Sequence, residues 1–163
     1  MPKDAATTSQ DPARIWEMMI EIGTCMFVTS SDGSPRGRPM STIPRPDERM
    51  IFLLTEATSG AAHDVSANGT VLLSFQGRSD HVALLGKAAI DPDTRTVAWL
   101  WSTGAQVFWP AGPEASNVVA IAVTPECADY WDGPNPAIGA VKFLFALASG
   151  KEPDMGERGA VRL

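Results

Sequence analysis

The chain has 163 residues, of which 44% are hydrophobic and 20% charged, and its net charge is −6. This length and composition predict one globular domain over 1–163, with a core of about 12–132 and a C-terminal helix and tail over 136–163. The acidic balance argues against nucleic acid and anionic membranes as partners, because both attract basic patches.

Neither the termini nor the cysteines indicate export or a metal. Residues 1–10 are polar and lack the apolar segment of a signal peptide. The longest apolar stretch, 137–148, contains Lys142 and is too short to span a bilayer. Cys25 and Cys127 stand far apart, and no Cys/His cluster suggests metal ligands. We therefore expect a cytoplasmic protein with no membrane association, no disulfide and no metal site.

The first third of the chain predicts one helix followed by three strands. Asp11 and Pro12 are a typical N-cap and first helical residue, and Gly23 is a typical C-cap. Apolar residues between them have the spacing of one buried helical face. The strands are separated by the Asp32-Gly33 turn and by two prolines, Pro44 among them, that are expected to break the sheet. The predicted elements are a helix over 12–22 and strands over 24–30, 36–43 and 49–55.

The remainder predicts short helices between further strands. Gly86 in mid-strand predicts a bulge or a close backbone approach, and Pro125 is expected to end the strand before it. The last helix is apolar most of the way round, which predicts two neighbours, one of them a second subunit. The predicted elements are helices over 59–68, 94–102 and 138–149 and strands over 70–76, 81–90 and 117–123. Six short strands with added helices favour a mainly β (α+β) fold built as a small, largely antiparallel barrel.

A candidate binding site begins at Arg38-Pro39-Met40, on a strand that precedes a hydroxyl-rich loop opening a helix. A cation and the free N–H groups of a helix N-terminus suit a flat ligand that carries a phosphate. The hydroxyls belong to Thr55, Thr58 and Ser59, and Gly60 lets the backbone approach closely. Ordinary explanations remain for each: a surface arginine, a core methionine and an N-capping serine.

In order and spacing, these motifs resemble the FMN-binding split barrels related to pyridoxamine 5'-phosphate oxidase, and within them the general-stress-protein branch. The matching segments are Arg38-Pro39-Met40, Leu53-Leu54-Thr55, Ser59-Gly60-Ala61, Ser74-Phe75, Gly86-Lys87-Ala88, Phe108-Trp109-Pro110-Ala111-Gly112 and Ala128-Asp129-Tyr130-Trp131-Asp132. No single tripeptide is specific, but the ordered set covers about 15–150, nearly the whole chain. The resemblance implies a six-stranded antiparallel split β-barrel of the FMN-binding type.

The resemblance also implies a cofactor and its place. FMN is expected, with FAD as an alternative, between the two subunits of a homodimer, where Trp109 would close the ring pocket of the opposite subunit. His81 lies near the position of a flavin-contacting glutamine in the oxidase relatives, although an ordinary strand histidine is the slightly better explanation. The predicted cofactor-binding residues are Arg38, Pro39, Met40, Leu54, Thr55, Thr58, Ser59, Gly60, His81 and Trp109.

One residue departs from the family pattern, because Ala61 stands where the family has a phosphate-binding lysine. A charge-assisted hydrogen bond is worth about 1.5–3 kcal/mol, so its loss weakens FMN binding roughly ten- to a hundredfold. This departure keeps three alternatives open. They are a non-catalytic flavin carrier or sensor, a split barrel that binds FAD, a deazaflavin or haem, and a barrel with an empty site.

The leading functional prediction is an oxidoreductase-like stress protein, because a flavin itself carries hydride and electron chemistry. No catalytic residue is assigned, since the chain has only two histidines and no G-x-S-x-G motif. A true pyridoxamine-phosphate oxidase is not expected, because no basic cluster is left for the phosphate of that substrate. The expected small-molecule partner is an electron donor or acceptor that the sequence does not name.

Overall fold

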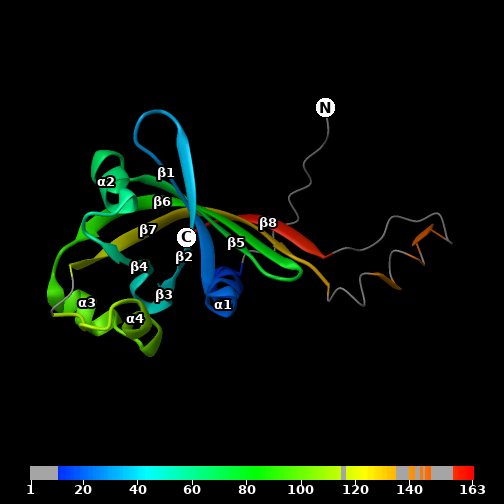
Figure 1. Cartoon of the computed structure of the whole chain (residues 1–163). Coiled ribbons are helices and arrows are strands. Elements are labelled where there is room, and N and C mark those ends of the chain that lie inside the picture. The colour runs from blue at the N-terminus through cyan, green and yellow to red at the C-terminus, as the bar shows by residue number, and fades with distance from the viewer. Residues whose placement is uncertain (1–10, 115–116, 135–139, 142–143, 145, 148–155) are drawn as a thin grey trace.

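A computed structural model describes residues 11–114, 117–134, 140–141, 144, 146–147 and 156–163. Its strands form one antiparallel sheet in the order β2-β1-β5-β6-β7-β4-β3, and β8 pairs with β7 (Figure 1). The strands are β1 (Thr24–Ser30), β2 (Pro35–Ser41), β3 (Ile43–Arg45), β4 (Met50–Glu56), β5 (Thr70–Gln76), β6 (Asp80–Asp91), β7 (Val118–Asp132) and β8 (Glu157–Arg162). The helices are α1 (Pro12–Ile22), the 3-10 turn η1 (Pro46–Glu48), α2 (Gly60–Ala67), α3 (Thr94–Leu100) and α4 (Thr103–Phe108).

The described sheet contains eight strands, so the prediction of six was wrong in number. The strand predicted over 36–43 is divided at Thr42 into β2 and the short β3, and β8 lies in a tail for which no strand was predicted. Pro44 does not break the sheet, because β3 is an end strand where a proline needs no ladder partner on its free side. The sheet is antiparallel throughout, as predicted.

β7 is 15 residues long and continues past Pro125, which was predicted to end it. At this point the strand changes its partner on one side. It pairs with β4 as far as Val123 and with β8 from Cys127 onward. Because Pro125 lies between these two ladders, its missing N–H removes no hydrogen bond from either of them.

The irregularity predicted at Gly86 is confirmed. The register between β6 and β7 shifts between Leu85 and Gly86, which makes a β-bulge opposite the proline of β7. A Cβ on Gly86 would lie 2.6 Å from the carbonyl oxygen of Thr124. The close approach of the two backbones therefore requires glycine here, and the bulge lets one long strand bend from one partner to the next.

The sheet curls without closing, because no ladder joins its two end strands in the described chain. β2 pairs only with β1, and β3 pairs only with β4. Pairing with β3 ends at Phe52, so Leu53–Glu56 of β4 has β7 on one side and no strand on the other. We call the gap between β2 and this part of β4 the open seam. Its borders carry backbone N–H and C=O groups without sheet partners, and the architecture is the predicted split barrel.

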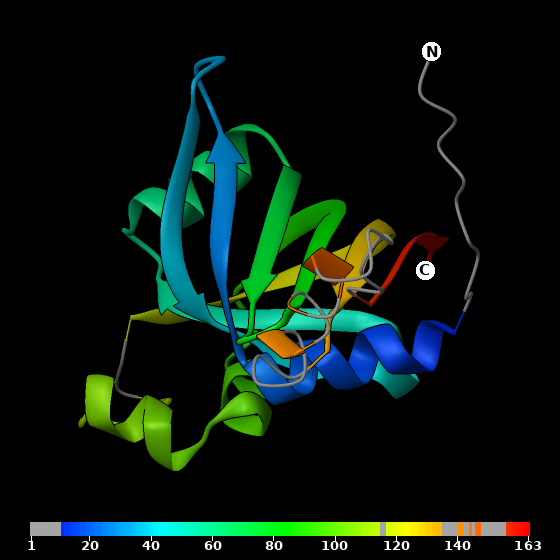
Figure 2. The same cartoon turned by 90° about the vertical axis from the view of Figure 1, so that its right-hand side faces the viewer.

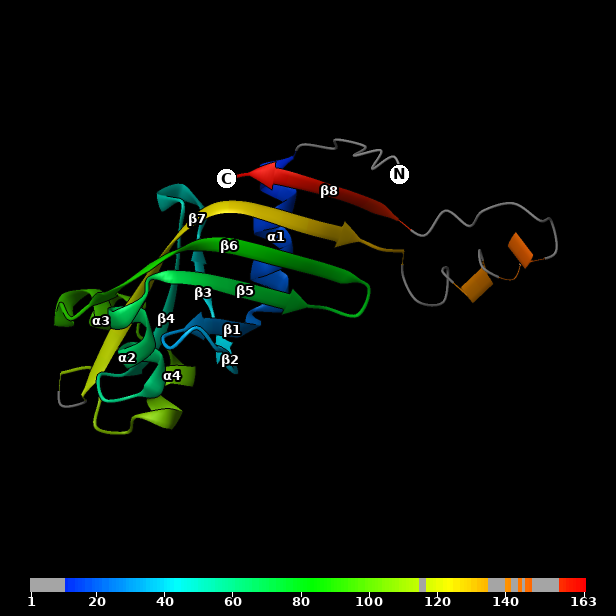
Figure 3. The same ribbon diagram turned by 90° about the horizontal axis from the view of Figure 1, so that it is seen from above.

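α1 crosses the concave side of the sheet and fills the core (Figures 2 and 3). Its ends form as predicted: the Asp11 side chain accepts a hydrogen bond from the Ala13 amide at 3.0 Å, and Gly23 closes the helix with a φ of 68°. Ile15 and Met18 on its buried face are fully covered. They pack against the inward side chains of the strands, which include Phe27, Leu73 and Leu84.

The opposite side of the sheet remains partly open. We define the outer sheet face as the surface formed by Met26, Val28, Leu72, Leu85 and Cys127, which lie side by side on β1, β5, β6 and β7. Met26 is 44% exposed and Leu85 is 45% exposed. An apolar strip therefore crosses four strands on the side away from the core.

The helix predicted over 94–102 is confirmed as α3, which is two residues shorter, and a second helix, α4, follows where none was predicted. α3 begins at the predicted N-cap Asp93 and ends at Leu100, after which the backbone is extended. Ser102 then starts α4, because its Oγ accepts a hydrogen bond from the Ala105 amide at 3.3 Å. Trp99 and Trp101 lie in different surroundings: the former contacts the Phe52 ring, and the latter packs beside α4.

The helix predicted over 138–149 falls mostly outside the described residues. Of its described members, Val141, Leu144 and Leu147 are about two-thirds exposed in this chain, and Ala146 is buried. The second subunit predicted to cover this helix stays a prediction. In the part of the chain that the structure describes, no helix has the length and apolar character needed to cross a membrane.

Candidate functional site

A cavity of about 560 Å³ occupies the open seam. Its walls come from β2, β3, the end of β4, the first turn of α2, and α4, and these helices lie on the same side of β2 (Figure 1). The lining residues are Arg38, Pro39, Met40, Ser41, Thr42, Ile43, Leu54, Thr55, Ser59, Gly60, Ala61, Ser102, Gly104, Ala105, Phe108 and Trp109. The volume lies within the range of about 300–1,000 Å³ that is usual for small-molecule sites.

Eight of the ten residues predicted to bind a cofactor line this cavity, although they belong to four separate segments of the chain. They are Arg38, Pro39, Met40, Leu54, Thr55, Ser59, Gly60 and Trp109. The other two lie elsewhere. Thr58 is exposed in the turn before α2. His81 is exposed on β6, where it borders a smaller hollow of about 340 Å³ with Gln76 and Trp131.

The wall formed by α4 was not predicted. Ser102, Gly104, Ala105 and Phe108 line the cavity from this helix. No element was predicted over 103–108. The available signal was Ser102, a residue type typical of an N-cap, followed by the small residues Gly104 and Ala105. Phe108 is 74% exposed, so the rim of the cavity carries a large apolar side chain.

Arg38 is paired with a carboxylate that lies outside the cavity lining. Asp64 on α2 is fully buried, and its Oδ2 accepts hydrogen bonds from Arg38 Nη2 at 2.9 Å and from Thr29 Oγ1 at 2.7 Å. These hydrogen bonds hold the pKa of Asp64 well below its usual range, although burial alone would raise it. Arg38 Nη1 is buried and has no acceptor among the described residues. The arginine is therefore fixed in place and its charge is compensated.

The hydroxyls at the start of α2 are bonded to each other. Thr55 Oγ1 donates to Ser59 Oγ at 2.9 Å, and Ser59 Oγ accepts a further hydrogen bond from the Ala62 amide at 3.1 Å. Ser59 is thus the N-cap of α2, which is the ordinary explanation for a serine at this position. Its contact with a ligand phosphate stays a prediction.

Trp109 lines the cavity of its own chain, whereas the family resemblance led us to expect it at the pocket of the opposite subunit. Its ring lies 6.0 Å from that of Trp101 and 6.1 Å from that of Phe108, measured between ring centroids. Gln106 connects the segments on either side of α4, because it accepts a hydrogen bond from Trp101 Nε1 at 2.9 Å and donates one to the Pro110 carbonyl at 2.8 Å. Trp109 is therefore held as an aromatic wall within the same chain.

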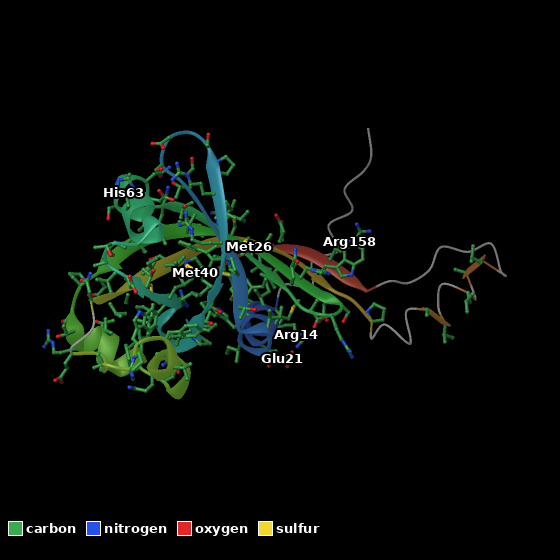
Figure 4. All side chains as sticks on the ribbon, viewed as in Figure 1. Arg14, Glu21, Met26, Met40, His63 and Arg158 are labelled. Carbon is green, nitrogen blue, oxygen red and sulfur yellow. The ribbon has the colours of Figure 1, made fainter. Side chains whose placement is uncertain are left out.

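The residues present suit the ring of a flat heteroaromatic ligand better than a phosphate. Met40, which Figure 4 shows on β2, and Trp109 offer soft and aromatic surfaces, and the unpaired edge of β2 offers backbone donors and acceptors. Ala61 is among the lining residues and brings no charge to the cavity. His63 points away from the barrel, and its side chain is 79% exposed (Figure 4). No cluster of three or more metal-binding side chains occurs in the described ranges.

The open seam and the curled antiparallel sheet define a split barrel, and the comparisons agree with this fold. The family described as pyridoxamine 5'-phosphate oxidase like matches residues 10–154. The chain therefore belongs to the pyridoxamine 5'-phosphate oxidase-like family, as its motifs predicted. No curated protein matches the sequence.

Solved structures of related proteins share the fold. The chain is similar to a candidate general stress protein 26 from Jannaschia sp. CCS1, with 19% identity, a TM-score of 0.77, and coverage of 93% of this chain and 97% of that one. It is also similar to a general stress FMN/FAD binding protein from Xanthomonas citri, with 17% identity, a TM-score of 0.66, and coverage of 76% and 89%. General stress protein 26 from Bacillus anthracis str. Sterne shares 20% identity over 72% of this chain and 93% of that one, with a TM-score of 0.61.

Proposed function

We propose that this protein is an oxidoreductase-like flavoprotein that binds FMN, with FAD as the alternative, in the cavity of the open seam. The observation that carries the proposal is the convergence of eight predicted residues from four segments on one cavity of suitable size. A structurally similar protein from Xanthomonas citri is described as an FMN/FAD binding protein, which supports the same ligand class.

Each wall of the cavity has a part in holding the ring. The free edge of β2 would hydrogen-bond the polar edge of the ring, Met40 and Trp109 would pack against its faces, and Arg38 would donate to a carbonyl oxygen. A bound flavin supplies hydride and electron transfer by its own chemistry. The work of this chain is to position the ring and to limit the access of water to it.

Redox turnover needs a small-molecule electron donor or acceptor. Acid–base chemistry is disfavoured, because the cavity lining offers no side chain to act as an acid or a base. Arg38 is the single ionisable side chain among the described lining residues. This composition also disfavours a true pyridoxamine-phosphate oxidase, whose substrate brings a second phosphate to be bound. A flavin carrier or sensor without turnover has the same structural requirements and is the second candidate, favoured by the lack of an acid or base.

We further propose a homodimer in which the outer sheet face meets a second copy. Met26 and Leu85 expose apolar surface in the middle of this face. Pro39, a residue of the cavity lining, is paired in register with Met26, so the face reaches the cavity. C2 dimers are the commonest closed assemblies, and the buried centres of dimer interfaces are enriched in apolar side chains.

The flavin assignment is tested by titrating the ligand-free protein with FMN and following the quenching of flavin fluorescence. We expect saturable binding with one flavin per chain. A cavity variant, Gly104→Phe, should block binding, because the new ring on α4 would occupy space within the cavity. Glu17→Phe, on an exposed position of α1, is the control and should bind as the wild type does. Absence of saturable binding up to millimolar FMN would sink the proposal.

A further inference from the structure

The charge within the cavity depends on one residue. Arg38 is the single charged side chain among the described residues that line it; the others are apolar, aromatic or carry a hydroxyl. Any electrostatic preference of this cavity for an anionic ligand therefore has to come from Arg38 or from backbone N–H groups.

Arg38 is not free to act as a full cation, because Asp64 lies against it. The 2.9 Å contact between Arg38 Nη2 and Asp64 Oδ2 is a close ion pair, and the carboxylate side chain is only 1% exposed. Such burial leaves little water to screen the charge of Asp64, so it acts strongly on its partner. The lowered pKa of Asp64 agrees with a carboxylate that stays ionised at neutral pH. A second anion placed next to Arg38 would be repelled by the first.

Few other donors remain at this end of the cavity. The Ala62 amide is already bonded to Ser59 Oγ, and the His63 amide is bonded to the Ser59 carbonyl. The amides of Gly60 and Ala61 remain in the first turn of α2, without a cationic side chain on the described lining to assist them. Neutral amides form weaker hydrogen bonds to an anion than charged groups do.

We propose that the cavity recognises the planar, uncharged ring of its ligand and is indifferent to a terminal phosphate, with Asp64 as the residue that removes the preference. This inference rests on the proposed flavin function and refines it: riboflavin is bound as well as FMN. Arg38 keeps a positioning task, because a guanidinium paired on one side still donates to a neutral carbonyl oxygen on another.

The first test compares riboflavin with FMN on the wild-type protein at low ionic strength. We expect dissociation constants within about threefold of each other. FMN binding more than about tenfold tighter than riboflavin would overturn the inference and leave the flavin function standing. Failure of both ligands to bind would defeat the flavin function and the inference together.

The second test removes the compensating charge with Asp64→Asn, which keeps the size of the side chain and an oxygen acceptor. FMN should then bind about tenfold tighter while riboflavin changes little, because only the phosphate senses the released charge of Arg38. Asp93→Asn is the matched control: Asp93, the N-cap of α3, pairs with Arg95, and neither residue lines the cavity or contacts Asp64. An unchanged ratio of the two dissociation constants in Asp64→Asn would contradict the proposed role.

Two further measurements separate this electrostatic role from a structural one. Asp64→Glu keeps the negative charge and should keep the wild-type ratio. The tighter FMN binding of Asp64→Asn should fade as NaCl is raised to about 0.5 M, because salt screens partly exposed charges. If Asp64→Asn does not fold, the wild-type comparison at low and high salt decides. FMN binding that weakens with salt while riboflavin binding does not would overturn the inference.

Discussion

Arg38, Asp64 and Ala61 together set the charge at one end of the cavity. The first is a cation on an end strand, the second is its buried counter-ion, and the third contributes a methyl group where a longer side chain would reach the ligand. None of the three is unusual alone. Their combination makes a site in which shape and backbone hydrogen bonds dominate over ionic attraction.

A lysine at Ala61 should restore an attraction for phosphate. Ala61 borders the cavity and is 3% exposed at the edge of the main core, so a longer side chain there needs the space of the cavity. Ala61→Lys should tighten FMN binding by about tenfold and leave riboflavin nearly unchanged, following the strength of a charged hydrogen bond. Ala57→Lys, in the exposed turn before α2, is the control. Equal gains for both ligands in a fluorescence titration would show that the new lysine does not contact the phosphate.

The buried Asp64 also makes the stability of the folded protein depend on pH. Its folded pKa lies below the value of 3.8 for a free aspartate, so it stabilises the fold fully above that value and loses this contribution as the pH falls below it. The difference in unfolding free energy between wild type and Asp64→Asn should therefore be constant above about pH 5 and shrink below about pH 4. Urea denaturation at several pH values measures it. A difference that grows on acidification would contradict the assignment of the ion pair.

At the scale of elements, the bulge between β6 and β7 allows β7 to pair with two different strands on one of its sides. β7 pairs with β4 along its first half and with β8 along its second, and β6 remains beside it throughout. The bend occurs where Gly86 meets the Pro125 segment. Because β4 carries Leu54 and Thr55 of the cavity, this bend places one border of the open seam.

A side chain at Gly86 should destabilise this bend. A Cβ there would lie 2.6 Å from the Thr124 carbonyl oxygen, and a backbone atom cannot rotate out of the way. Gly86→Ala should lower the free energy of unfolding by about 1–3 kcal/mol, measured by urea denaturation at fixed protein concentration. Gly104→Ala is the control, since the nearest atom is 3.6 Å away on a helix, where alanine is favoured by up to about 1 kcal/mol. Equal stability of Gly86→Ala and wild type would mean that β6 and β7 can move apart at no cost to accommodate the new methyl group.

At the scale of the whole molecule, the sheet has one face in the core and one face partly open. α1 and α2 pack on the concave side, which contains the main core. The outer sheet face carries its apolar strip on the other side and continues to Pro39 at the cavity. Assembly through this face would bring a second chain close to the site without adding any residue that the single chain needs to line it.

A charge in the middle of the outer sheet face should prevent assembly. Leu85 is 45% exposed, so Leu85→Glu is tolerated by the monomer but would bury a carboxylate in a dimer. We expect sedimentation velocity at micromolar concentration to give a dimer for wild type and a monomer for this variant. Ile20→Glu places the same charge on exposed α1 and should remain a dimer. If Leu85→Glu remains a dimer, the interface lies outside the outer sheet face.

Local signals in the sequence were enough to predict most elements and the family. Caps such as Asp11 and Ser59 and turn residues such as Gly33 act within a few residues of themselves, so they can be interpreted without the fold. Ordered motifs identified the split barrel and named eight of the residues that line one cavity.

Only the tertiary structure decided which groups pair across the chain. Asp64 lies 26 residues from Arg38, and its burial against that arginine depends on α2 packing beside the first hairpin. Pro125 remains within a strand because two different partners flank it, and His81 lies outside the cavity because it stands beside the β5–β6 turn, opposite Gln76. Such outcomes arise from contacts between distant segments. The spacing of residues along the chain does not predict such long-range contacts directly.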